Sequence, residues 1–183
     1  MLGLGELTMR YLILALLVIS TGTVTAQTDS WWTYIADYDG LPGSVRLDMG
    51  VYPSTPDENY PIVVITGVQY EKHLDGLPQA KDLVGLNEVQ ERLVGVFEGE
   101  FEAIYVGTFT HNGEQLHYIY VSAKAEVRDS LEAFYKANCP ELEFYINIKP
   151  DPSWKAYRNF LYPNKETMEF YGYKTEPTQD LSE

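Results

Sequence analysis

The chain has 183 residues, with 27 acidic against 13 basic side chains and a formal net charge of −14 at pH 7. An acidic surface of this kind repels phosphate groups, so the composition disfavours nucleic acid and anionic lipid headgroups as partners. Cys139 is the single cysteine, which excludes an internal disulfide, and the 45% of hydrophobic residues must hold the core by packing alone.

Residues 1–26 have the pattern of an export signal. Arg10 gives a basic start, residues 11–19 form an apolar stretch of nine residues, and the segment ends on Val24, Thr25 and Ala26. This order is typical of a signal peptide that is cleaved on export. The apolar stretch is well short of the ~20 residues that cross a bilayer. We therefore expect an exported protein, periplasmic or secreted, with no membrane span after cleavage.

Residues 27–174 are of a length that predicts a single domain, and residues 175–183 predict a polar, disordered tail. Residues 31–38 are rich in aromatic and β-branched side chains and predict a strand, which turns at residues 39–43 into a returning strand over residues 44–49. These two strands form an N-terminal β-hairpin.

Two prolines, Pro53 and Pro56, predict a loop over residues 50–59. Residues 61–69 are apolar on both alternating faces, which indicates a central strand that is covered on each side. The sequence Asp-Gly-Leu-Pro at residues 75–78 repeats residues 39–42, and both copies are suited to turns. Residues 82–98 then carry apolar side chains at helical spacing.

The clearest local signal is Asn112-Gly113, the preferred pair for a two-residue hairpin turn, between strands predicted at residues 101–111 and 114–122. A second amphipathic helix follows and stops before Pro140. Residues 142–148 alternate as a strand. Asp151 and Pro152 suit the start of a third helix, expected over residues 151–161.

From residue 61 to residue 148 the predicted order is strand, helix, strand, strand, helix, strand. This is the order of a ferredoxin-like βαββαβ core, here with an N-terminal β-hairpin and a C-terminal helix. The predicted fold class is α+β, with both core helices on one face of the sheet and the first and third core strands at its centre.

The register that Asn112-Gly113 implies pairs Gly107 with Tyr118 and Tyr105 with Tyr120. It predicts a tyrosine-rich sheet face opposite the helices, which Tyr145 joins. Such a face can stack planar ligands or sugar rings and hydrogen-bond them through its hydroxyls. In the alternative, the N-terminal hairpin or the helix carrying Trp154 and Tyr157 covers this face, and these aromatic side chains belong to the core.

Several segments resemble a bacterial family known as domain of unknown function 695 (DUF695). The matching segments are residues 32–34, 75–78, 105–108 with 118–120, and 151–163. The resemblance implies an α+β domain without an established activity, so no catalytic residue is transferred from it.

The sequence lacks the usual zinc, nucleotide-binding and serine-hydrolase motifs, so we expect no metal, no cofactor and no catalytic residues. His73 and Asp75 share one loop. They either bind a metal together, act together as a catalytic base or serve as ordinary turn residues.

We expect a non-catalytic exported domain that binds a protein, peptide or glycan of the cell envelope. The candidate binding residues are Tyr105, Tyr118, Tyr120, Tyr145, His73, Asp75, Trp154 and Tyr157. The alternative is a cell-envelope hydrolase that uses His73 or His117 with nearby carboxylates.

Overall fold

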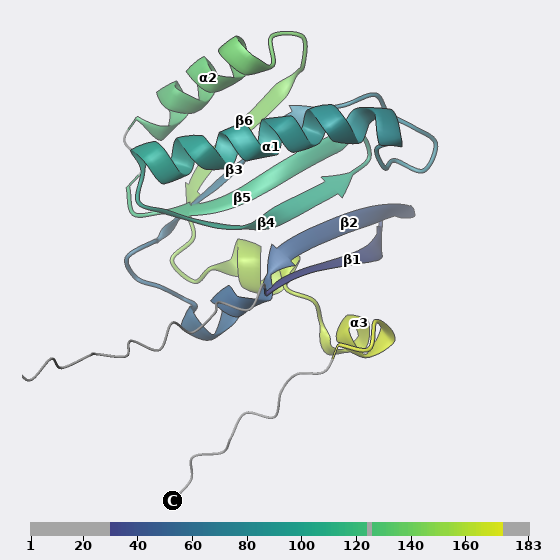
Figure 1. Cartoon of the computed structure of the whole chain (residues 1–183). Coiled ribbons are helices and arrows are strands. Elements are labelled where there is room, and N and C mark those ends of the chain that lie inside the picture. The colour runs from purple at the N-terminus through teal and green to yellow at the C-terminus, as the bar shows by residue number, and fades with distance from the viewer. Residues whose placement is uncertain (1–29, 124–125, 174–183) are drawn as a thin grey trace, which may run out of the picture.

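The computed structural model describes residues 30–123 and 126–173, so the predicted export signal and the predicted tail lie outside the described residues. Six strands form one antiparallel sheet in the order β1-β2-β4-β5-β3-β6 (Figure 1). Their bounds are β1 Trp31–Tyr38, β2 Leu41–Asp48, β3 Ile62–Gln69, β4 Ala103–His111, β5 Glu114–Val121 and β6 Phe144–Pro150. The helical elements are η1 Met49–Ser54, α1 Ala80–Glu100, α2 Val127–Asn138, η2 Ala156–Leu161 and α3 Lys165–Phe170.

The predicted α+β class is confirmed. From β3 to β6 the elements follow the order β3-α1-β4-β5-α2-β6, and these four strands lie in the order β4-β5-β3-β6, as expected for a ferredoxin-like core. The hairpin of β1 and β2 extends the sheet beyond β4. Helices η1 and α3 were not predicted, and the third helix expected over residues 151–161 is a turn followed by the short π-helix η2.

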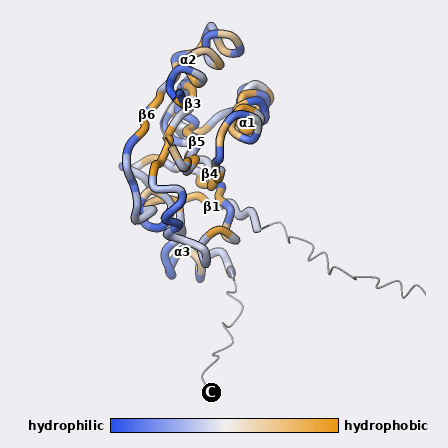
Figure 2. The backbone as a smooth tube through the Cα atoms, turned by 90° about the vertical axis from the view of Figure 1, so that its left-hand side faces the viewer, coloured by the Kyte–Doolittle hydropathy of each residue, from blue (hydrophilic) through white to orange (hydrophobic). Residues whose placement is uncertain are grey.

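Helices α1 and α2 pack on one face of the sheet, and Figure 2 shows α1 as a separate layer beside the strands. The segment that contains η2 packs on the opposite face. Strand β3 contributes Val64 and Val68 to the first core and Val63 and Ile65 to the second. The expectation of a central strand covered on both sides is therefore confirmed.

A β-bulge at Val106 corrects the predicted register of the long hairpin. Gly107 does pair with Tyr118, but on the other side of the bulge Tyr105 pairs with Ile119 and Ile104 pairs with Tyr120. The side-chain period of a strand is two, so one extra residue moves every side chain beyond it to the other face. Tyr105 consequently packs with the helix-side core, away from Tyr118 and Tyr120.

The C-terminal segment closes one edge of the sheet. β1 is the outermost strand on its side, and α3 lies next to it (Figure 1). The hydroxyl of Tyr171 accepts a hydrogen bond from the Ile35 amide at 3.0 Å and donates one to the Ile35 carbonyl at 2.9 Å. One side chain thus occupies a position that an additional strand would otherwise fill.

Gly67 allows β3 and β5 to approach each other closely, because a Cβ on this residue would overlap the Gln115 carbonyl oxygen. We expect Gly67→Ala to lower the free energy of unfolding by about 1–3 kcal/mol through overpacking. Gly95→Ala is the control: Gly95 lies within α1, a Cβ there would meet no atom within 4 Å, and the substitution should stabilise the protein by about 1 kcal/mol. Urea unfolding measures both changes, and a Gly67→Ala variant of unchanged stability would contradict this close strand approach.

Candidate functional site

The predicted tyrosine face is covered by the chain's own C-terminal segment, in agreement with the alternative prediction. The Trp154 ring stacks on Tyr120 with centroids 3.8 Å apart and an interplanar angle of 4°. Trp154, Tyr157, Tyr118 and Tyr120 are all buried. Of the two alternatives the covered face is the one present, because residues 154–161 supply the apolar layer that this face needs.

Asp151 fixes the covering segment in place. Its carboxylate accepts hydrogen bonds from the Tyr120 hydroxyl at 2.7 Å and from the Lys155 and Ala156 amides at 2.9 and 2.8 Å. Burial raises the pKa of Tyr120, so the hydroxyl stays protonated and donates. Tyr145 differs from the other tyrosines: its side chain lies on β6 and is 46% exposed.

His117 is buried on the helix side of β5. Its Nδ1 lies 2.9 Å from the Tyr105 hydroxyl, whereas its Nε2 has no hydrogen-bond partner among the described residues. Burial lowers the pKa of His117 to about 3, so its ring is neutral near pH 7. Within the described ranges it has no carboxylate partner, which a hydrolase base of the expected type would need.

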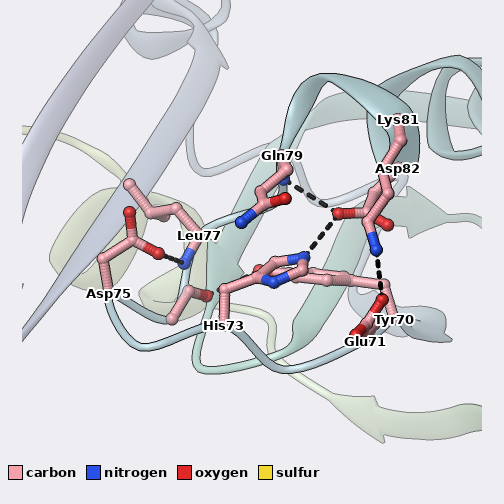
Figure 3. Close-up of polar contacts among 9 residues, drawn as sticks. Tyr70, Glu71, His73, Asp75, Leu77, Gln79, Lys81 and Asp82 are labelled. Carbon is pink, nitrogen blue, oxygen red and sulfur yellow. Dashed lines mark hydrogen bonds and ion pairs between the residues drawn. The ribbon is translucent and has the colours of Figure 1, made fainter.

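His73 contacts a carboxylate that was not among the predicted site residues. Its Nε2 lies 2.7 Å from Asp82 Oδ2, and the same oxygen accepts a hydrogen bond from the Gln79 amide at the start of α1 (Figure 3). The hydrogen bond from His73 lowers the pKa of the Asp82 carboxyl. Asp75 instead accepts a hydrogen bond from the Leu77 amide, as an ordinary turn residue does, so of the alternatives left open by the sequence the pairing of His73 with Asp75 is not the one the structure has.

Glu71, His73 and Asp82 place possible metal ligands within 4.8 Å of one another. Each of these atoms already has a protein partner, since Lys81 pairs with Glu71 and Asp82 accepts hydrogen bonds from His73 and Gln79 (Figure 3). A metal ion would have to displace these contacts. We interpret the cluster as the clamp that fixes the first turn of α1.

A groove between α1 and the sheet is larger than two other cavities in the described part of the chain. Its volume is about 490 Å³, against about 240 and 280 Å³ for the other two. Strands β1, β2, β4 and β5 form its floor, α1 forms one wall, and Leu77 and Pro78 form the rim. The remaining lining residues are Thr33, Ile35, Ser44, Arg46, Leu83, Asn87, Gln90, Thr108, Thr110 and Gln115.

The floor of this groove is polar where an apolar core would be expected. Thr108 and Thr110 on β4 and Gln115 on β5 are buried, and the cross-strand pairs Thr110–Gln115 and Thr108–His117 continue the polar row. Gln115 is 7% exposed, and its Oε1 has no hydrogen-bond partner among the described residues. Buried polar groups are nearly always paired, so this acceptor needs a donor, such as a water molecule, beyond the described residues.

The Asp-Gly-Leu-Pro turn at residues 75–78 forms the rim because it is held against the tip of the β4–β5 hairpin. The Tyr70 amide donates to the Gly113 carbonyl at 2.8 Å, and the Gly113 amide donates to the Gly76 carbonyl at 3.2 Å. Gly76 has a φ of +73°, and a Cβ there would press on the backbone of Asn112. The repeated tetrapeptide was therefore a correct turn prediction, but its place at a groove was not predicted.

Fold and groove together define an α+β domain with a polar cleft between a helix and an antiparallel sheet. The sequence model of the family described as "Family of unknown function (DUF695)" matches residues 29–162, and the chain belongs to this family. The predicted resemblance is thereby confirmed. No curated protein and no solved structure matches the chain. Of the helices in the described ranges, none combines the length and apolar character needed to cross a membrane.

Proposed function

We propose that this protein is an exported, non-catalytic binding domain whose ligand occupies the groove between α1 and the sheet. The unpaired Oε1 of Gln115 is the observation that carries this proposal. The groove volume of about 490 Å³ lies within the range of small-ligand sites, roughly 300–1,000 Å³. Export rests on the pattern of residues 1–26.

An unpaired buried acceptor costs a protein about 1–3 kcal/mol. Gln115 Nε2 makes only a long hydrogen bond of 3.4 Å to Thr110 Oγ1, so the carboxamide is weakly held. The terminal torsion of a glutamine is broad and nearly two-fold. Rotation about this torsion can bring Oε1 toward a donor in the groove, and a ligand with such a donor recovers the cost of the unpaired group.

The alternative function, a cell-envelope hydrolase, would rest on His73 and Asp82. Their 2.7 Å contact resembles a base held by a carboxylate. Neither residue lines any of the three cavities. The binding function is accordingly the better supported of the two.

A substitution that fills the groove tests the proposal. Asn87 is exposed on α1 and lines the groove, so Asn87→Trp should block it without disturbing the core. The probe is a fragment panel of amino acids, dipeptides and small sugars, followed by ¹H–¹⁵N chemical shifts. We expect at least one fragment to shift groove residues in the wild-type protein and to bind Asn87→Trp at least about tenfold more weakly.

Val84→Trp is the matched control, because Val84 is exposed on α1 but lines none of these cavities. It should bind the same fragments as the wild-type protein. Shifts that cluster away from the groove, or equal binding by Asn87→Trp, would contradict the proposal.

A further inference from the structure

We infer that the groove binds a short peptide through its free carboxylate, with Arg46 as the group that holds the carboxylate. This inference rests on the proposed function and adds the class of ligand. It follows from the charge of the groove, from its carboxamide side chains and from the absence of aromatic side chains among its lining residues.

The groove is a locally cationic site in an acidic protein. The chain has a net charge of −14, yet no acidic side chain lines the groove, and Arg46 is the single charged residue among the lining residues. Within the described ranges Arg46 makes no ion pair. An arginine in this position offers planar, bidentate donors that match a carboxylate.

Trp31 holds the guanidinium of Arg46 in place. The Arg46 Cζ atom lies 4.5 Å from the centroid of the Trp31 ring, which is a cation–π contact. Because the two residues lie on neighbouring strands, β1 and β2, the sheet itself fixes the position of the cation. A contact through the ring face leaves the guanidinium edge available to an anion.

Carboxamides supply the remaining polar contacts. Asn87 and Gln90 lie three residues apart on α1 and so share a helix face, and Gln115 lies across from them on the sheet. A carboxamide offers a donor and an acceptor, which are the complements of the C=O and N–H of a peptide bond. The unpaired Oε1 of Gln115 requires an N–H or O–H donor, and a peptide N–H supplies one.

The apolar lining residues fit a peptide better than a sugar. Ile35, Leu77 and Leu83 offer aliphatic surface for a small apolar side chain, whereas the lining residues include no aromatic ring on which a sugar could stack. The groove therefore combines one anion contact, several amide contacts and one aliphatic patch.

Two tripeptides that differ by one charge test the inference. The probes are acetyl-Ala-Leu-Ala with a free C-terminal carboxylate and the same peptide as its C-terminal amide, with maltose as the sugar. Binding to the full chain is measured by calorimetry and by ¹H–¹⁵N chemical shifts. We expect the carboxylate peptide to shift groove residues and to bind at least about tenfold more tightly than the amide, with the difference shrinking as salt rises.

Arg46→Gln should remove this difference and weaken the carboxylate peptide about tenfold or more. Arg92→Gln is the matched control, because Arg92 is an exposed arginine on α1 that lines a different cavity and lies near Glu88. Equal binding of both peptides, or an Arg46→Gln variant that binds as the wild type does, overturns the inference and leaves the groove as a binding site. If maltose is the only probe that shifts groove residues, the proposed ligand class is overturned, but the groove remains a binding site. If no probe shifts the groove, the inference fails, and the fragment panel then decides the proposed function separately.

Discussion

Trp154→Ala is expected to lower the free energy of unfolding by about 3–5 kcal/mol, the range for removing a large aromatic side chain from a core. Trp154 is 0% exposed, stacks on Tyr120 and donates a hydrogen bond from its indole nitrogen to the Asp57 carbonyl at 3.2 Å. Its removal leaves a cavity between η2 and the sheet and an unpaired carbonyl. Urea unfolding followed by far-UV circular dichroism measures the loss.

Phe170→Ala is the control for this prediction. Phe170 belongs to the same C-terminal part of the chain but is 83% exposed, so the substitution should change the stability by less than about 0.5 kcal/mol. A Trp154→Ala variant within about 1 kcal/mol of the wild type would show that residues 154–161 do not form a core layer.

The second large effect is a loss of stability in acid that depends on His117. Burial lowers the pKa of His117 from its ordinary value of 6.5 to about 3. Below pH 6.5 the unfolded chain therefore takes up a proton that the folded protein does not accept until about pH 3. His117 does not affect the free energy of unfolding above pH 6.5. As the pH falls from 6.5 toward 3, it lowers the free energy of unfolding by about 1.4 kcal/mol for each pH unit.

The measurement is the free energy of unfolding at several pH values between 3.5 and 7.5. His117→Phe keeps a ring at the site but removes the titrating group, so its stability should fall less steeply with acid than that of the wild type. Tyr105→Phe removes the hydroxyl next to His117 Nδ1 and leaves the histidine in place, so it should retain the steep dependence. Identical slopes for His117→Phe and the wild type would contradict a histidine that is buried and neutral.

The sequence was sufficient to predict the fold class because its signals were local and periodic. The apolar run at residues 61–69 and the Asn112-Gly113 turn identified a central strand and a hairpin, and both are present. The bulge at Val106 was not predictable in the same way. A turn fixes the register only near itself, and the one local signal, Gly107 within the strand, does not distinguish a bulge from a close backbone approach.

The groove was not predicted because its lining residues come from four strands, one helix and one loop. A usable signal was nevertheless present in the hairpin. Thr108 and Thr110 on one strand and Gln115 and His117 on the other alternate on a face that should carry aliphatic residues if two helices simply cover it. The tyrosines are numerous, but aromatic side chains on a sheet are more often part of the core than a ligand platform.

The hydrogen bonds of Tyr171 bear on strand pairing at the outer edge of the sheet. The outer strand of a sheet presents unpaired amides and carbonyls, and such a strand can template pairing with a second chain. Natural sheets often block this with charges, prolines or a bulge, whereas here a phenol donates to and accepts from one residue of β1. Occupation of this strand edge is therefore tied to a residue 136 positions further along the chain.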